Sequence, residues 1–285
     1  MEPRRPLKGP GAKKSFGQHF LERAWAEKVV RAAAISADDV VLEIGPGRGA
    51  ITHLLAARAA HVVAFEIDRE LVPRLTATAA PNVTVVEGDF LVRSADGIRA
   101  ELLRAGARPG TLRVVGNLPY NVASPILFKL LALRREGLPI VDAQVMLQRE
   151  VADRLTAPPG TKDYGVLSVL IRHQAEAERV LALPPGAFRP PPQVHSAVVR
   201  LRFHRPDPAP HDADVFAAMT RAIFTRRRKT LANALQAYRS DGVGEALRHA
   251  GLDGRRRPET LTIAELVQLS DALSTPADKA ADPLR

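Results

Sequence analysis

Two periodicities alternate along the first half of the chain. Short apolar runs rich in β-branched residues predict strands, and the segments between them repeat apolar positions at the spacing of a helix. Strands that alternate with helices form a mostly parallel sheet covered on both faces, so we expect an α/β fold. The predicted strands are residues 40–44, 61–65, 83–86, 113–115 and 141–147, after a first helix over 22–34.

The pattern changes after residue 148. A helix is predicted over 165–172, and extended segments over 179–183 and 197–203 could complete the sheet with antiparallel strands. Three prolines lie between His204 and Pro210, and proline disfavours both helix and sheet, so a domain boundary is expected there.

The remainder of the chain is predicted to be helical. Phe224, Leu231, Leu235 and Tyr238 are spaced for one helical face, and Thr262 with Glu265 predicts a capping box at the last helix. We therefore expect four segments: a basic flexible arm (1–14), an α/β domain (15–205), a helical domain (211–274) and a flexible tail (275–285).

Composition narrows the class of protein. The chain has 285 residues, of which 46% are hydrophobic, and its longest apolar runs are far below the roughly 20 residues that cross a membrane. It has no cysteine, which excludes disulfides and thiolate zinc sites. We expect a cytoplasmic protein without a membrane partner.

The net charge of +10 favours a polyanionic partner, although excess arginine can also serve solubility alone. The positive charge is concentrated in residues 1–14 and 221–229, which indicates a surface that binds nucleic acid. The cations of the second segment, which we expect to contact RNA phosphates, are Arg221, Arg226, Arg227, Arg228 and Lys229.

Three predicted strands end in residues typical of a ligand site. Ligands of such sheets bind beyond the carboxyl ends of the strands. The glycine turn Gly45 to Gly49 follows the first strand, and Glu43 inside that strand favours a positively charged ligand over a pyrophosphate. Glu66 ends the second strand where an acid can bind a ribose diol, and Asp89 follows the third. Taken singly, these features also suit a tight turn, a solvated strand end or a nucleotide site.

The fourth strand ends in Asn-Leu-Pro-Tyr, which suits a flat base with an exocyclic amine. The Asn117 side-chain carbonyl and the Leu118 backbone carbonyl could accept both amine protons and aim the nitrogen lone pair at an electrophile. Pro119 has no backbone donor and restricts Leu118 to extended geometry. Tyr120 would stack on a base that has left its helix. In an arbitrary position the same four residues would form only a turn.

Together these motifs resemble those of the ribosomal RNA adenine dimethyltransferases. The similarity runs from about Lys14 to about Leu269, and is greatest to the bacterial members that dimethylate two adjacent adenines near the 3′ end of small-subunit (16S) RNA. The segments that carry it are 15–21 (SFGQHFL), 45–49 (GPGRG), 117–125 (NLPYNVASP), 188–194 (FRPPPQV) and 227–231 (RRKTL).

The resemblance implies a Rossmann-like class I methyltransferase domain with a mostly parallel sheet, followed by a small α-helical C-terminal domain. It implies that S-adenosylmethionine is the methyl donor, that no metal is needed, and that a monomer acts on RNA of a 30S particle or its precursor during ribosome maturation. It also implies site residues by position. Cofactor contacts are expected at His19, Leu21, Gly45, Gly47, Glu66, Asp89 and Asn117, and catalytic roles at Asn117, Leu118, Pro119, Tyr120 and Phe188.

Two of these positions carry a specific expectation. Phe188 should join Tyr120 in sandwiching the target adenine. The family often has Asn where this chain has His19, so a cofactor contact there is expected through the backbone.

Other functions remain open from the sequence alone. A related antibiotic-resistance methyltransferase of large-subunit RNA shares the glycine turn and the Asn-Leu-Pro-Tyr type of motif. A noncatalytic ribosome assembly factor could keep the fold but would have a damaged cofactor pocket. An NAD-dependent oxidoreductase would have no use for the residues from Asn117 to Tyr120.

Overall fold

The computed structural model describes residues 18–108 and 110–274, which divide into two compact units. The first unit contains residues up to 152 together with 178–203, and the second contains 153–177 and the residues from 204 onward. The expected basic arm and C-terminal tail lie outside the described residues. No described helix is both long enough and apolar enough to cross a membrane.

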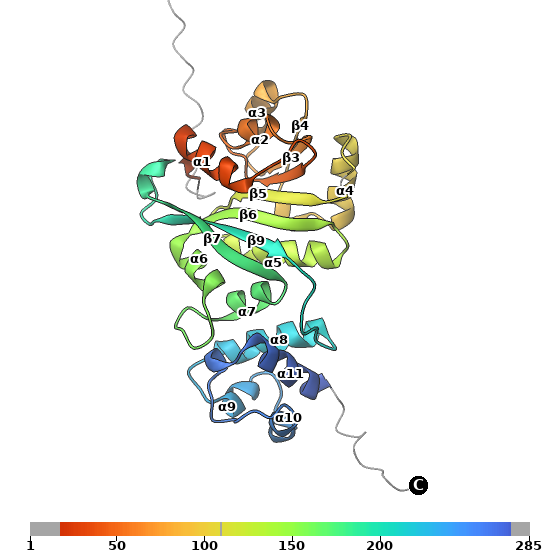
Figure 1. Ribbon diagram of the computed structural model, residues 1–285, viewed down its shortest axis with the longest axis vertical. Helices are drawn as coiled ribbons and strands as arrows, with labels where there is room; N and C mark the ends of the chain where they lie inside the picture. The colour runs from red at the N-terminus through yellow and green to blue at the C-terminus, as the bar shows by residue number, and fades with distance from the viewer. Residues whose placement is uncertain (1–17, 109, 275–285) are drawn as a thin grey trace, which may run out of the picture. The chain divides into compact units, whose positions relative to one another are not determined.

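The first unit is built on one seven-stranded sheet (Figure 1). Five neighbouring strands are parallel, and β9 pairs antiparallel with β6, so the predicted α/β class with a mostly parallel sheet is confirmed. In spatial order the strands are β4 (Val83–Glu87), β3 (His61–Glu66), β2 (Val40–Ile44), β5 (Leu112–Asn117), β6 (Ile140–Gln148), β9 (Ser196–Phe203) and β7 (Ala175–Leu183).

The strand order reverses beside β2, because β3 lies on one side of it and β5 on the other. All five residues of β2 are buried, as expected of a parallel strand covered on both faces. A crevice forms where the order reverses, at the carboxyl ends of these strands. The sequence pattern therefore positions the glycine turn after β2 next to the end of β5.

Helices and short segments surround the sheet. Buried residues of α1 pack with Leu55 of α2 and with Val41, Val115 and Met146, which share one face of the sheet. The remaining elements of the unit are β1 (Phe20–Leu21), α1 (Arg23–Ala33), α2 (Thr52–Ala56), α3 (Val72–Thr78), the 3₁₀ turn Phe90–Val92, α4 (Ala95–Arg104), α5 (Ala123–Arg135), the first half of α6 (Arg149–Thr156), the 3₁₀ turn Pro185–Ala187 and β8 (Phe188–Arg189).

A second, two-stranded sheet joins distant parts of the first unit. Strand β1 pairs antiparallel with β8, with Phe20 opposite Arg189 and Leu21 opposite Phe188. This pairing places the segment before α1 beside the segment before β9. Both segments come from the motifs that carry the family resemblance, and the pairing brings them to the carboxyl edge of the main sheet.

The second unit is helical in its described residues, apart from the start of β7. Its core includes Met219 and Ile223 of α8, and Tyr164 packs edge-on against Phe224 with ring centroids 5.9 Å apart. The expected capping box is present, since Thr262 N–H donates to Glu265 and Glu265 N–H to the Thr262 hydroxyl. The elements are the end of α6, α7 (Val166–Arg172), α8 (Ala213–Thr225), α9 (Leu231–Leu235), α10 (Val243–His249), the 3₁₀ turn Pro258–Thr260 and α11 (Ile263–Ser274).

The structure differs from two expectations here. Residues 153–177 belong to the helical unit and not to the α/β domain, because α7 packs against α8. The single helix expected to carry Phe224 and Tyr238 on one face is interrupted: α8 ends at Thr225, and the Lys229 N–H donates to the Arg226 carbonyl in a turn before α9. Phe224 and Leu231 are buried from two helices, and do not share one helical face.

Candidate active site

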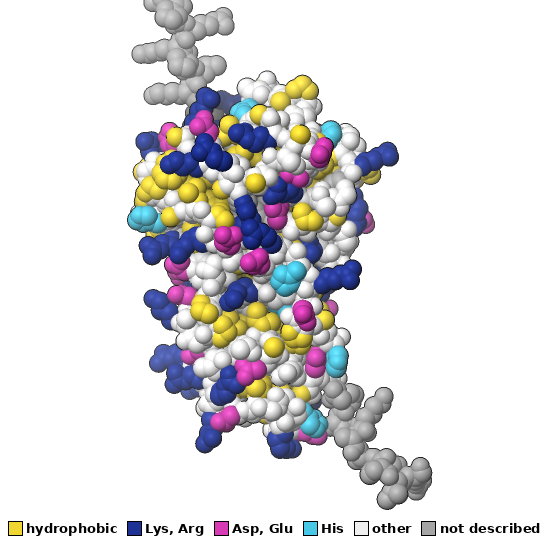
Figure 2. All heavy atoms as spheres, viewed as in Figure 1, with side chains coloured by type: hydrophobic (Ala, Val, Ile, Leu, Met, Phe, Trp, Pro, Cys, Tyr) yellow, Lys and Arg dark blue, Asp and Glu magenta, His cyan; other side chains and the backbone are white. Residues whose placement is uncertain are grey.

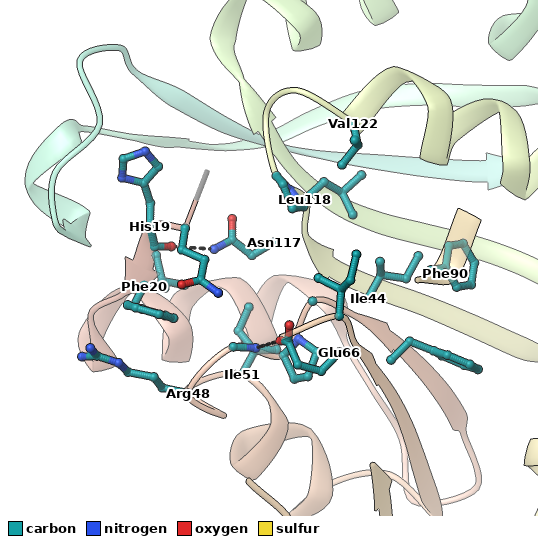
Figure 3. Close-up of a pocket in the computed structure, with 18 of the residues that line it drawn as sticks. His19, Phe20, Ile44, Arg48, Ile51, Glu66, Phe90, Asn117, Leu118 and Val122 are labelled. Atoms are coloured by element: carbon teal, nitrogen blue, oxygen red, sulfur yellow. Dashed lines mark hydrogen bonds between the residues drawn. The ribbon is translucent and has the colours of Figure 1, made fainter. Parts of the chain in front are cut away.

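A cavity of about 510 Å³ lies at the carboxyl ends of β2 to β5, within the first unit. It is bounded on one side by the segment around β1 and on the other by the turn after β5 (Figure 3). Every residue expected to contact the cofactor lies in its wall, as does the whole run from Asn117 to Tyr120. These cofactor residues are His19, Leu21, Gly45, Gly47, Glu66, Asp89 and Asn117.

The glycine turn forms the floor of this cavity. Gly47 has a φ of +59°, which favours glycine, and a Cβ there would stand 3.2 Å from the Phe20 ring. Its N–H donates to the Glu66 carboxylate at 2.8 Å. Glycine at this position therefore permits both the turn and the close approach of β1.

Glu66 ends β3 and is 4% exposed. One carboxylate oxygen accepts from Gly47 N–H, and the other accepts from Asp68 N–H at 2.9 Å. Burial raises the pKa of Glu66, while the two backbone N–H groups act to lower it. Each carboxylate oxygen can accept a second hydrogen bond, so this fixed acid suits the hydroxyl groups of a ribose.

Glu43 does not have the role that its position in the sequence indicated. Its side chain is 1% exposed and lies outside the cavity wall. Burial raises the pKa of Glu43 to about 8, so the group is mostly protonated at neutral pH. It therefore presents little negative charge to a cationic ligand.

Asp89 follows β4 and begins a 3₁₀ turn. Its Oδ1 accepts from the Leu91 N–H at 2.9 Å, which fixes the carboxylate in the cavity wall. Phe90, Leu91 and Ile67 line the same end of the cavity and supply apolar surface. An apolar slot with one fixed acceptor suits a purine that carries an amino group.

The Asn117 side chain is held in one orientation by the residue that precedes β1. Its side-chain amide nitrogen donates to the backbone carbonyl of His19 at 2.9 Å (Figure 3). The side-chain carbonyl is therefore the atom of Asn117 that can accept from a ligand. The Pro119 carbonyl accepts from the Val122 N–H, which closes the turn and leaves Leu118 between two constrained neighbours.

The Tyr120 ring is fixed at both ends. Its hydroxyl is 2.6 Å from the Ser196 hydroxyl, and its ring stacks on His19 with centroids 5.6 Å apart and planes 27° apart. Burial raises the pKa of Tyr120, while the Ser196 hydroxyl acts to lower it, so the phenol is neutral at physiological pH.

Phe188 does not reach this cavity in the structure. Its ring is fully buried in the apolar cluster that includes Leu21, Val30 and Met146, and the neighbouring Arg189 lines the cavity instead. The side chains of a strand point alternately to opposite faces, which separates these two neighbours. The sandwich of the target adenine between Phe188 and Tyr120 stays a prediction, since the Phe188 ring lies outside the cavity wall in this structure.

Sequence reasoning missed several residues of the site. Gln18 donates from its side chain to the buried Asp68 at 2.9 Å, and Arg48 lies over the Phe20 ring at 4.1 Å. Gln18 and Arg48 lie inside motifs that the sequence analysis had identified, so their spacing alone could have suggested them. Ser196 gave no such signal, because its contact with Tyr120 spans 76 positions. No group of three or more His, Asp or Glu side chains within the described ranges could hold a metal ion.

The candidate RNA-binding residues lie in the second unit. Arg221, Arg226, Arg228 and Lys229 are exposed, whereas Arg227 donates to the Lys162 carbonyl at 2.7 Å and lies 3.9 Å from Glu259. Figure 2 shows many Lys and Arg side chains on the visible face of the protein. The turn that follows α8 thus presents several cations to solvent, while Arg227 also ties the turn to its own unit.

Comparisons with known proteins show relatives over most of the chain. The chain is 47% identical over 272 residues to Ribosomal RNA small subunit methyltransferase A of Geobacillus thermodenitrificans, covering 92% of this chain and 90% of that protein. A solved dimethyladenosine transferase from Plasmodium falciparum shares the fold, with a TM-score of 0.71 and 24% identity over 88% of this chain and 96% of that one. The 23S rRNA methyltransferase ErmE gives a TM-score of 0.60 and 28% identity, over 90% of this chain and 100% of that one.

The family comparison extends over nearly the whole sequence. The model of the family described as Ribosomal RNA adenine dimethylase matches residues 10–275, which include the glycine turn, the Asn-Leu-Pro-Tyr run and the basic turn of the helical unit. The chain therefore belongs to the ribosomal RNA adenine dimethylase family.

Proposed function

We propose that this protein dimethylates the exocyclic amino groups of two adjacent adenines near the 3′ end of small-subunit (16S) ribosomal RNA. The observation that carries the proposal is the orientation of Asn117 beside the Tyr120 ring. Its amide nitrogen donates to the His19 carbonyl, so its carbonyl oxygen is the atom that can accept a hydrogen bond from the amine of the base. S-adenosylmethionine, when bound, supplies an electrophilic methyl group on a sulfonium.

The chain contributes binding and orientation to this reaction. Glu66 would accept hydrogen bonds from the ribose hydroxyls of the donor, and Asp89 with its apolar neighbours would receive the adenine of the donor, since all of them line the cavity. The amino nitrogen of the target base is a poor nucleophile, because its lone pair is delocalised into the ring. Asn117 and the Leu118 carbonyl hold the amine protons so that the lone pair is directed outward, and proximity supplies most of the rate increase.

A second methyl transfer makes a further demand on the same two acceptors. In the first transfer the amine gains a methyl group, releases one proton to solvent and keeps the other, so one acceptor loses its partner and a methyl group takes that place. Asn117 is held by His19 independently of the substrate, so it can keep its orientation through both steps. Tyr120 stacks on the base throughout.

Positively charged side chains of the second unit contact the RNA in this proposal. We assign phosphate contacts to Arg221, Arg226, Arg228 and Lys229, with Arg227 orienting the turn. The substrate is taken to be a 30S particle or its precursor in the cytoplasm, methylated by a monomer without a metal or a membrane. Methylation of this substrate would make the protein a participant in small-subunit maturation.

The test is transfer of labelled methyl groups from S-adenosylmethionine to small subunits that lack adenine dimethylation. The intact protein should form dimethyladenosine, Asn117→Ala should not, and Asn233→Ala, an exposed residue of α9, should behave as the intact protein does. Incorporation into large-subunit RNA alone would instead favour the resistance-type activity. Incorporation into neither would favour a noncatalytic assembly factor.

A further inference from the structure

The turn after β4 is held by hydrogen bonds to its backbone from two sides. The N–H of Gly88 donates to the carbonyl of Glu66 at 2.8 Å. The carbonyl of the preceding residue, Glu87, accepts from Nη2 of Arg93 at 2.6 Å. This N–H and this carbonyl belong to the same peptide group, so both of its polar atoms are bonded. The direction in which the chain continues from this peptide group to Asp89 is fixed as a result.

Arg93 occupies the space that a side chain on Gly88 would need. A Cβ added to Gly88 would overlap Nη2 of Arg93, and the φ of Gly88 is +133°, which favours glycine. The guanidinium can therefore lie directly against the turn. Gly88 lines the cavity and Arg93 does not, so the arginine supports this part of the wall from outside.

Stability alone does not account for the placement of Arg93. Its Nε is buried and has no hydrogen-bond partner among the described residues, and an unpaired buried donor lowers stability. The guanidinium lies 5.8 Å from the centroid of the Phe65 ring, which also lines the cavity. Arg93 thus contacts two parts of the wall that surrounds Asp89, at the expense of one of its own hydrogen bonds.

We infer that Arg93 is a positioning residue for the adenine of S-adenosylmethionine, and that it acts through the placement of Asp89. This inference rests on the proposed function, in which the Asp89 carboxylate accepts a hydrogen bond from the amino group of the donor's adenine. Oδ1 of Asp89 is bonded to the Leu91 N–H within the same turn, so the aim of the carboxylate depends on the backbone that carries it. Arg93 fixes that backbone at the peptide group before Asp89.

The inference is tested by the ligand selectivity of the protein without RNA. S-adenosylhomocysteine carries the amino group, whereas S-inosylhomocysteine has a carbonyl oxygen in its place and sets an acceptor against the Asp89 carboxylate. In titration calorimetry the intact protein should bind the first about 10- to 100-fold more tightly. Arg93→Met removes the charge and the donor but keeps an apolar stem, and should reduce this ratio roughly fivefold or more. Arg93→Lys should recover most of the ratio, since lysine can still donate to the Glu87 carbonyl.

Arg69→Met is the matched control, because Arg69 contacts the same turn through the Glu87 carboxylate, at 3.1 Å, and not through the backbone carbonyl. Its ratio should equal that of the intact protein. In an Asp89→Ala background, Arg93→Met should leave the ratio unchanged, because the residue through which it acts is absent. Arg93→Ala carries the same predictions and replaces Arg93→Met if that variant does not fold.

Three results would overturn the inference. If Arg93→Met weakens both ligands by the same factor, its role is structural only. If Arg69→Met loses the same selectivity, the positive charge beside the turn matters and the bond to the carbonyl does not. If Arg93→Met changes the ratio in the Asp89→Ala background, it does not act through Asp89. A protein that shows the expected selectivity but methylates no adenine would contradict the proposed function and leave the role of Arg93 in ligand binding intact.

Discussion

The side-chain amide of Asn117 donates to the backbone carbonyl of His19, 98 positions earlier in the chain. This hydrogen bond fixes which atom of Asn117 faces the cavity. It also fixes the segment that leads into β1 against the carboxyl end of β5. The orientation of the proposed catalytic amide therefore depends on the backbone of His19, while the His19 side chain bonds elsewhere, to the Pro190 carbonyl.

Replacing Asn117 by Asp should change the hydrogen bonding of the side chain while its size stays the same. The variant loses the donor and sets a carboxylate oxygen against the His19 carbonyl, at a cost of about 1–3 kcal/mol for an unpaired buried group. We expect kcat to fall by roughly 100-fold or more. Steady-state kinetics would measure this, and Asn233→Asp is the matched control. Activity near that of the intact protein would show that the amide orientation is unimportant.

Replacing Glu66 by Gln should weaken donor binding. The carboxylate accepts from both Gly47 and Asp68, and an amide nitrogen in its place would face one of these N–H groups. We expect Kd for S-adenosylmethionine to rise by roughly tenfold or more, measured by titration calorimetry. The exposed Glu70→Gln serves as control. Equal affinities for the two variants would remove Glu66 from the donor site.

Replacing Glu43 by Gln should change the pH dependence of stability. Burial raises the pKa of Glu43 from its ordinary value of 4.5 to about 8. Between these two pH values the folded protein keeps a proton on Glu43 that the unfolded chain has lost. The folded state is therefore progressively penalised as pH rises from about 4.5 to about 8. The Gln variant lacks this penalty, so its Tm relative to the intact protein should be higher at pH 9 than at pH 5. Parallel Tm curves would contradict the assignment.

Replacing Gly47 by Ala should impair the cavity more than the fold. The new Cβ would stand 3.2 Å from the Phe20 ring, and the φ of +59° adds strain of about 1–2 kcal/mol. Gly160 also has a positive φ, of +84°, but a Cβ there meets nothing within 4 Å. Both variants should lose similar stability in denaturant unfolding, and only Gly47→Ala should lose donor affinity. Equal donor affinity in the two would contradict this reading.

Replacing Arg226 and Arg228 together by Ala should weaken RNA binding across sequences. Loss of two phosphate contacts should reduce the slope of log Kd against log salt by roughly 1.5. Methyl transfer from a saturated complex should be largely retained. Arg248→Ala with Arg257→Ala, two exposed cations of the same unit, is the control pair. A salt slope that does not change would remove the turn from the RNA interface.

The sequence predicted the parts of the site that follow strands. Glu66, Asp89 and Asn117 each end or follow a parallel strand, and the carboxyl ends of such strands meet at one edge. Local pattern was sufficient here, because each residue is positioned by its own strand. The turn after α8 was not predicted, for the opposite reason. Residues Arg226 to Lys229 are compatible with the helix expected there, and the helix ends through backbone hydrogen bonds that no periodicity reveals.

The sequence pattern did not predict the contacts between strand ends. The β1–β8 pairing is only two residues long and joins segments far apart in the chain, so its register has no local signal. That register decides that Arg189 lines the cavity while Phe188 enters the core. A one-residue shift would exchange them, because side chains alternate along a strand. The family motif identified the right segment but not which of its residues lines the cavity.

The position of β8 and Ser196 late in the α/β unit bears on when the protein becomes active. A nascent chain that has passed β6 already holds the glycine turn, Glu66, Asp89 and Asn117. It still lacks the Pro190 carbonyl that orients the His19 ring and the Ser196 hydroxyl that anchors Tyr120. The donor side of the cavity can thus assemble during translation, while the base side waits for the last strands. The base side of the cavity is therefore complete only once the last strands of the α/β unit have been made, and the proposed RNA contacts follow later, with the helical unit.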